Sequence, residues 1–283
     1  MTTKGFALAA WIALSSFLCP RSDAQEEHAW QFTPVAGNNI AWSCTGEGEP
    51  TMVLIAGGGF SGHDSYSRIY HNYDGPGRLC MYDRAGLGAS KFVNPKTRTL
   101  DQMVEELHGV SSANSWGDAV LVAHSFGGFI ARAYAHKYPE DVLGILFLDV
   151  AHEDWLAKLK EKMSASDWAI LERILDWTER AFHEDYPEAE QSVRQTKLRA
   201  DLPITVLSRG IPHTRIRIER MSYEGIDLYE NEHNALQSKI AELTSNSEHR
   251  VARYSSHVFN DFDPWIVIEE IKLLVKRLPE HRK

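Results

Sequence analysis

A serine lies where an apolar run meets a helical pattern, and a catalytic nucleophile can occupy such a turn between strand and helix. Residues 119–122 are apolar and predict a buried strand, and residues 129–135 predict a helix. Ser125 lies between them, with the small residues Ala123 and Gly127 two positions before and after it. This spacing predicts a nucleophile elbow, although a serine in a tight turn without chemistry would show the same pattern.

A serine hydroxyl becomes a nucleophile when a neighbouring base removes its proton, and histidine has a suitable pKa for this task. Of the thirteen histidines, His257 has the most suitable position, because it follows the last predicted strand, 249–254. Loops after the strands of a parallel sheet converge on one edge, where the elbow also lies. We therefore expect His257 to be the base. His124 is expected to point away from the serine, and His152 is a weaker candidate.

A histidine base also needs a carboxylate that fixes its tautomer. The loop after Ser208 is the common place for this acid, but residues 209–214 contain none. Asp149 lies near the end of the preceding predicted strand, 142–150, at the same edge, so we expect it to be the acid. It could instead only hydrogen-bond its own loop. The alternative acids are Glu153, Asp154 and Glu219.

A glycine-rich loop follows a central apolar strand and permits two interpretations. Gly57, Gly59 and Gly62 match a dinucleotide-binding fingerprint. Asp83 then stands where an acid that binds ribose is expected. That fingerprint also needs a helix directly after the loop, and residues 63–68 are too polar to predict one. The other interpretation is an oxyanion loop, whose glycines let a backbone N–H approach a reacting carbonyl oxygen.

Strands alternate with helices along most of the chain. Thr99 and Gln102 form a capping box, and Asp263 caps a last helix that begins at Pro264. This alternation predicts an α/β fold, in which a mostly parallel sheet is covered on both faces. Further strands are predicted at 38–44, 51–56, 78–83 and 203–208.

Residues 151–200 break this alternation, because they contain no apolar strand. Large apolar side chains recur there at helical intervals. We interpret the segment as a helical insertion over the strand ends, whose aromatic faces either line a pocket or serve helix packing. These side chains are Trp155, Trp168, Leu171, Leu175 and Trp177.

The first residues predict export. Residues 6–18 are apolar but too short for a comfortable membrane span, and Ser22 and Ala24 are small where a signal peptidase cleaves. We expect a signal peptide at 1–24, a domain at 25–283, and a secreted or periplasmic location. The alternative is an uncleaved membrane anchor.

Composition and cysteines narrow the possibilities further. The length of 283 residues fits one large domain. The formal net charge of −9 disfavours a nucleic-acid binder, which would normally have a basic surface. No paired histidine spacing indicates zinc, so no metal is expected. Cys44 and Cys80 remain after signal removal, and an oxidising compartment favours a disulfide between them. Two buried free thiols are the alternative.

Together these motifs resemble the α/β-hydrolase superfamily from Asn38 to the C-terminus. The resemblance implies a mostly parallel eight-stranded sheet with a helical cap between the sixth and seventh strands. It also implies that the second strand lies beside the fourth, which would bring Cys44 and Cys80 together. The matching segments are 56–59, 82–88, 123–128 and 256–257.

The same resemblance implies roles for individual residues. Ser125 would be the nucleophile and His257 the base, with the oxyanion held by the N–H groups of Phe126 and Gly58. Some relatives carry their acid after the sixth strand, which favours Asp149, whereas the missing acid after the seventh strand departs from the usual pattern.

The expected function is therefore an exported serine hydrolase that cleaves a small-molecule carboxylic ester through an acyl-enzyme intermediate. We expect no metal or organic cofactor, no nucleic-acid partner, and no stable membrane span after signal removal. Amide, lactone or thioester hydrolysis would use the same residues. A non-catalytic binding protein on this fold and a nicotinamide oxidoreductase are the remaining alternatives.

Overall fold

Eight strands form one sheet in the computed structural model, which describes residues 29–93, 95–213 and 221–279. Their order is β1-β2-β4-β3-β5-β6-β7-β8, and every pair beyond β4 is parallel, whereas β1, β2 and β4 pair antiparallel. The expected mostly parallel eight-stranded sheet is thus confirmed. The strands are β1 (Gln31–Val35), β2 (Asn38–Gly46), β3 (Thr51–Ile55), β4 (Arg78–Tyr82), β5 (Ala119–His124), β6 (Val142–Leu148), β7 (Ile204–Arg209) and β8 (Ser247–Ala252).

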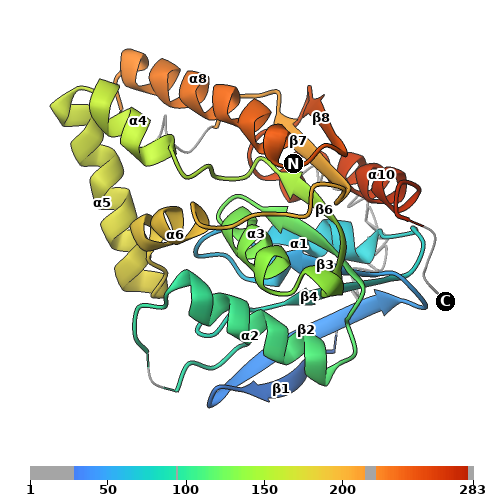
Figure 1. Cartoon of the computed structure of the whole chain (residues 1–283). Coiled ribbons are helices and arrows are strands. Elements are labelled where there is room, and N and C mark those ends of the chain that lie inside the picture. Colours follow the sequence, from blue (N-terminus) through green and yellow to red (C-terminus); the bar gives the residue numbers. More distant parts are fainter. Residues whose placement is uncertain (1–28, 94, 214–220, 280–283) are drawn as a thin grey trace, which may run out of the picture.

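Helices cover both faces of this sheet (Figure 1). Alternate residues of β3 enter different cores: Val53 packs with the helices α2 and α3, and Leu54 packs with α1 and α10. Burial on both faces explains why the central strands are almost continuously apolar. The helices are α1 (Gly62–His71), α2 (Leu100–Ala113), α3 (Gly127–Lys137) and α10 (Pro264–Val275), with the short η1 (Pro139–Asp141), η2 (Ala241–Leu243) and α9 (Phe259–Phe262) between other elements.

Helix α1 was not expected, and the prediction that residues 63–68 are too polar for a helix is wrong. Ser61 and Asp64 form a capping box at its N-terminus, which satisfies backbone N–H groups that the first turn leaves unpaired. Tyr66 and Ile69 are buried against the sheet. A narrow apolar face and a good cap are therefore sufficient for a helix in a segment that is mainly polar.

Three helices lie between β6 and β7, where the helical insertion was expected: α4 (Trp155–Lys162), α5 (Ala165–Phe182) and α6 (Tyr186–Val193). Figure 1 shows α4 and α5 beyond the edge of the sheet, with α8 (Tyr223–Ile240) beside α4. Apolar side chains of α4, α5 and α8 form a third core. The limits 25–283 for the domain and 151–200 for the insertion stay predictions.

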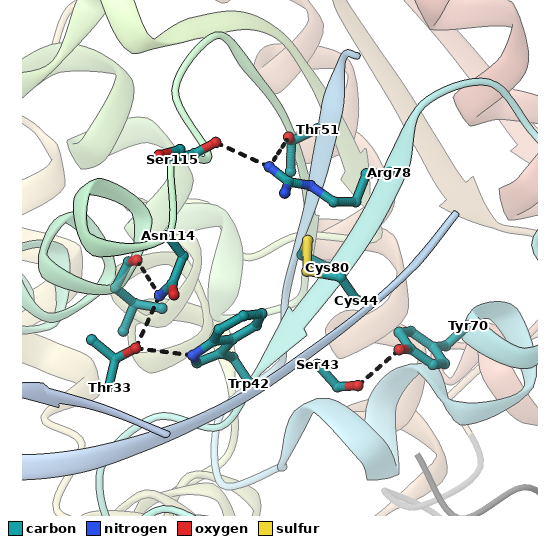
Figure 2. The surroundings of a disulfide bond; sticks show 11 residues. Thr33, Trp42, Ser43, Cys44, Thr51, Tyr70, Arg78, Cys80, Asn114 and Ser115 are labelled. Carbon is teal, nitrogen blue, oxygen red and sulfur yellow. Dashed lines mark hydrogen bonds between the residues drawn. A yellow bond between two sulfur atoms is a disulfide. The ribbon is translucent and has the colours of Figure 1, made fainter. Parts of the chain in front are cut away.

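A disulfide joins Cys44 on β2 to Cys80 on β4, directly across the antiparallel pair (Figure 2). Beside it, the indole Nε1 of Trp42 donates a hydrogen bond to Thr33 Oγ1 at 2.9 Å. The pairing that the resemblance implied is therefore present. It ties the antiparallel margin of the sheet to the parallel strands.

A buried carboxyl joins two helices of the insertion. Glu190 on α6 is 7% exposed, and its Oε1 accepts a hydrogen bond from the N–H of Leu156 on α4 at 3.3 Å. Burial raises the pKa of Glu190 to about 8, although this hydrogen bond acts in the opposite direction. The folded protein thus keeps this carboxyl protonated at pH values at which the unfolded chain ionises it.

Removal of the disulfide should lower stability. The bridge closes a chain segment of 36 residues, and loss of such a constraint costs about 2–4 kcal/mol, mainly through the unfolded state. We expect a reductant to lower the melting temperature of the wild type but not of the Cys44→Ala/Cys80→Ala variant. Mass spectrometry that finds two free thiols before reduction would contradict the bridge.

Glu190 should make stability fall as the pH rises. Below about pH 4.5 both states are protonated, and between that pH and about 8 only the unfolded chain loses its proton. Glu190→Gln should therefore unfold like the wild type at low pH, but be more stable by about 2–4 kcal/mol near pH 8, since one pKa unit corresponds to ~1.4 kcal/mol. Denaturant titrations at both pH values measure this difference. The exposed Glu140→Gln is the control, and equal stability of Glu190→Gln and the wild type near pH 8 would disprove the effect.

Candidate active site

Ser125 occupies a sharp turn between β5 and α3. Its backbone φ of +53° lies in the left-handed region that residues other than glycine seldom adopt. The following turn leaves no room for a larger residue, because a Cβ atom at Gly127 would lie 2.5 Å from the carbonyl oxygen of Ile55. This is the strand–turn–helix geometry that the spacing of small residues predicts.

His257 lies between Ser125 and Asp149. Its Nε2 is 3.0 Å from Ser125 Oγ, and its Nδ1 is 2.6 Å from Asp149 Oδ2. With the proton on Nδ1, the ring donates to the carboxylate and accepts from the serine hydroxyl. Ser125 and Asp149 directly follow β5 and β6, and His257 lies in the loop after β8, so the structure brings together the three side chains expected from the sequence.

The alternative acids are engaged elsewhere or lie outside the described residues. Glu153 Oε1 accepts from Arg132 Nη2 at 2.9 Å, and Asp154 Oδ1 accepts from Arg194 Nη1 at 2.5 Å. Glu219 lies outside the described residues. Among the candidates that the structure describes, Asp149 is the acid in contact with His257.

Asp149 is fully buried and has several donors besides His257. Arg209 Nη1 lies 2.5 Å from Oδ2, the N–H of Arg209 lies 3.2 Å from Oδ1, and His233 Nε2 lies 2.9 Å from Oδ1. Burial by itself raises the pKa of this carboxyl, but His233, Arg209 and the hydrogen bonds outweigh burial and hold the pKa well below its usual range. Asp149 is therefore ionised at neutral pH.

Sequence reasoning missed Arg209 and His233. Arg209 ends β7, at the point where an acid was sought, and His233 lies on α8, three residues after Glu230. Glu230 Oε2 accepts from Arg209 Nη2 at 2.7 Å. The spacing of Glu230 and His233 on one helical face was the signal available in the sequence.

Two further histidines contact His257. The expectation that His124 points away from Ser125 did not foresee its contact with His257: His124 Nε2 donates to the backbone carbonyl of His257 at 2.7 Å, and the two ring centroids are 4.6 Å apart. The ring of His213 stacks on His257 with centroids also 4.6 Å apart. Burial lowers the pKa of His124 to about 3 and that of His213 to about 2, so both rings are neutral near pH 7.

A buried ion pair between Arg84 and Glu184 binds the backbone of the glycine loop. Arg84 donates to the carbonyl oxygens of Ala56 at 2.7 Å and Gly57 at 2.6 Å, and its Nε lies 2.6 Å from Glu184 Oε1. Glu184 Oε2 in turn accepts the N–H of Gly59 at 2.8 Å. The N–H of Gly59 is thereby engaged in holding the loop.

Gly58 lies beside Phe126. A Cβ atom at Gly58 would be 3.3 Å from the Cβ of Phe126, and both residues line the same cavity as Ser125. The two residues expected to form an oxyanion hole are thus adjacent at the candidate nucleophile.

Asp83 has a structural task. Its buried carboxylate accepts the N–H of Gly62 at 2.7 Å and the N–H of Ala89 at 2.7 Å. These bonds join two loops at the sheet edge. The carboxylate is therefore not placed to bind a ribose, although α1 follows the glycine loop.

A cavity of about 250 Å³ opens in front of Ser125. Helix α5 contributes Leu171, Ile174 and Leu175 to its wall, and Trp155 and Tyr229 lie on the same lining. These side chains give the cavity a mainly apolar surface. Trp155 and Leu171, noted in the sequence for helical spacing, thus serve both helix packing and the cavity.

The described residues form neither a metal-binding cluster nor a helix that could span a membrane. Within residues 29–93, 95–213 and 221–279, no group of three or more His, Cys, Asp or Glu residues is arranged to hold a metal ion. The helices formed by these residues are all too short or too polar to cross a membrane. The predicted signal peptide at 1–24 lies outside the described residues.

Comparison with known proteins places the fold. A family model described as alpha/beta hydrolase fold matches residues 50–256. The protein YqjL of Bacillus subtilis is 31% identical over 220 residues, which cover 77% of this chain and 80% of YqjL. Proline iminopeptidase PfmaB of Pestalotiopsis fici is 27% identical over 164 residues, covering 55% of this chain and 58% of that protein.

Solved structures agree with this fold. Mouse alpha/beta hydrolase domain-containing protein 10 superposes with a TM-score of 0.61 at 12% identity, covering 88% of this chain and 97% of that one. A putative lipase of Acinetobacter baumannii superposes with a TM-score of 0.59 at 16% identity, covering 88% and 92%. At these identities the likeness concerns the fold alone.

Proposed function

We propose that this chain, which belongs to the alpha/beta hydrolase family, is a serine hydrolase that cleaves a small-molecule carboxylic ester. Ser125 is the nucleophile, His257 the base, and Asp149 the acid that orients His257. The N–H groups of Phe126 and Gly58 bind the oxyanion. The observation that carries the proposal is the position of the His257 ring, within hydrogen-bond distance of Ser125 on one side and Asp149 on the other.

The first half of the reaction forms an acyl-enzyme. His257 Nε2 takes the proton of the Ser125 hydroxyl while Oγ attacks the carbonyl carbon of the ester. The carbonyl oxygen becomes an oxyanion next to the start of α3 and the glycine loop, where backbone N–H groups stabilise it. When this tetrahedral intermediate collapses, the alcohol leaves with the proton that His257 returns.

The second half releases the acid. His257 removes a proton from a water molecule, which attacks the acyl carbon bound to Ser125 Oγ. The oxyanion forms a second time and collapses, and the proton on His257 returns to Ser125. Asp149 stabilises the imidazolium in both halves, because it is ionised and in contact with Nδ1.

The cavity favours an uncharged substrate with an apolar part. Its walls include the aliphatic side chains of Ile174 and Leu175 on α5. Arg209 contributes to the lining, but Asp149 and Glu230 already pair with its guanidinium. The carboxylate of Asp64, which also lines the cavity, would repel an anionic substrate. A neutral ester of a short apolar acid meets these conditions.

Amide hydrolysis is the second candidate, because one relative is named a proline iminopeptidase and others are named putative carbamate hydrolases. The same residues would act on an amide, and the leaving amine would need the proton of His257 more strongly than an alcohol does. Hydrolysis of a lactone or a thioester would use the same residues and needs no further catalytic group.

A nicotinamide oxidoreductase is disfavoured, because the carboxylate of Asp83 is already bound to the N–H groups of Gly62 and Ala89.

We also propose export to an oxidising compartment, secreted or periplasmic. Supporting features are the signal-like pattern of residues 1–24 and the disulfide between Cys44 and Cys80.

A fluorophosphonate probe should label the wild type at Ser125. Ser125→Ala should abolish labelling, and His257→Gln and Asp149→Asn should slow it by about 100-fold or more, because each removes part of the activation of the hydroxyl. Gel fluorescence and mass spectrometry of the labelled peptide measure both effects. Exposed Ser112→Ala and His71→Gln are matched controls that should react like the wild type.

Folding of each variant is checked by circular dichroism. A folded wild type that takes no label would refute the serine hydrolase and favour a binding protein on this fold. Unchanged labelling of folded Asp149→Asn would exclude Asp149 as the acid and direct attention to Glu219.

Esters should be cleaved faster than amides. We expect kcat/KM for the p-nitrophenyl ester of a short aliphatic acid to exceed that for the p-nitroanilide of the same acid by about 1,000-fold or more. Absorbance at the wavelength of each released product gives both rates. Prolyl p-nitroanilide tests the amide candidate directly, and its efficient cleavage would replace the ester by an N-terminal amide as the substrate class.

A further inference from the structure

The candidate acid is bound to a second pair of buried charges. Arg209 Nη1 lies 2.5 Å from Asp149 Oδ2, while Nη2 and Nε of the same guanidinium lie 2.7 and 3.1 Å from Glu230 Oε2. Asp149, Arg209 and Glu230 are 0, 4 and 8% exposed. Water therefore screens these charges little, and their sum decides the field at the adjacent ring of His257.

The net charge of this cluster depends on Glu230. Asp149 and Arg209 alone cancel, and a neutral pair would stabilise an imidazolium only weakly. Glu230 adds one negative charge and thus restores a net charge of −1 on the side of His257 that holds Asp149. The arginine fixes the carboxylate in position, and the glutamate compensates for the positive charge that this fixation introduces.

Glu230 also reaches His257 by a second route. Its Oε1 accepts the N–H of His213 at 2.8 Å, and the His213 ring stacks on the ring of His257 with centroids 4.6 Å apart. One carboxylate of α8 thus touches both the charge partner of the acid and the residue that packs on the base.

We infer that Glu230 is a positioning residue that acts through Arg209 to keep the charge opposite His257 negative. The inference rests on the proposed function, because it assigns a role in activating the proposed base. Among the described residues, the groups around His257 are His124 of β5, Asp149 after β6, His213 after β7 and His233 of α8, with Arg209 and Glu230 behind Asp149 and Asp64 on the lining of the same cavity. The three histidines are held neutral by burial, so the charged groups of the described residues that act through Asp149 near pH 7 are Asp149 itself, Arg209 and Glu230.

The test compares Glu230→Gln with the double variant Arg209→Met/Glu230→Gln. In the single variant the remaining Asp149–Arg209 pair is neutral, and we expect the midpoint of the acidic limb of fluorophosphonate labelling to fall by about 1 pH unit, with a labelling rate lower by about 10-fold on the plateau. The double variant removes both extra charges and leaves Asp149 with its single charge. Its midpoint should return to within about 0.3 unit of the wild type.

The return of the midpoint in the double variant distinguishes an electrostatic role of Glu230 from a purely structural one. A merely structural Glu230 would leave the midpoint unchanged in the single variant, and the second substitution would not restore anything. Glu232→Gln is the matched control, because Glu232 lies on the same helix and pairs with Lys162. It should keep the wild-type profile.

A second measurement makes the inference independent of turnover. NMR of the His257 ring signals over about pH 5 to 9 records its protonation directly, with Ser125→Ala as a common background. The ring should titrate at lower pH in Glu230→Gln and near the reference value in the double variant. Equal titration in all three proteins would overturn the role of Glu230, whereas missing labelling of the folded wild type would overturn the proposed function and leave the NMR result to decide the charge effect.

Discussion

The buried carboxylate of Asp149 is the interaction on which the site depends. An ionised carboxylate without water is costly unless donors surround it, and here the donors come from the end of β7, from α8 and from the loop after β8. These segments must all be docked before Asp149 can remain charged. The last third of the chain therefore folds around the same carboxylate that orients His257, and stability and the proposed chemistry share one group.

A second buried charge connects the helical insertion to the sheet. Glu184 lies in the segment between α5 and α6, but its carboxylate reaches Arg84 and the N–H of Gly59 beneath the glycine loop. Removal of Glu184 would take away the carboxylate that pairs directly with the buried Arg84, which also donates to two carbonyl oxygens. The insertion is therefore part of the structure that holds the glycine loop, in addition to contributing to the apolar wall of the cavity.

Two residues with a strained backbone lie at the same place. Ser125 and Asp149 both have positive φ values, +53° and +48°, which cost about 1–3 kcal/mol each in residues other than glycine. The surrounding contacts maintain this strain: Gly127 fits against the carbonyl of Ile55, and the N–H of Ser125 donates to Leu148 at 3.1 Å. A tightly packed sheet edge thus keeps both side chains aimed at His257.

The sequence by itself determined the features that depend on neighbouring residues. Small residues around Ser125 indicated the elbow, apolar runs indicated the central strands, and the capping box at Thr99 indicated the start of α2. Asp149 and His257 could be selected because both follow strands that end at one edge. Helix α1 was missed because its apolar face is narrow and most of residues 63–68, within the helix, are polar.

Only the tertiary structure decided the surroundings of Asp149, the orientation of His124 and the ion pair beneath the glycine loop. Arg209 and His233 contact Asp149 across 60 and 84 residues of chain, and Glu184 pairs with Arg84 across 100. No local period marks such pairs, since a buried polar residue acquires its partner only when distant elements pack together. The physical reason is that hydrogen bonds and charges act through space over a few ångströms, whereas sequence patterns record only the path of the chain.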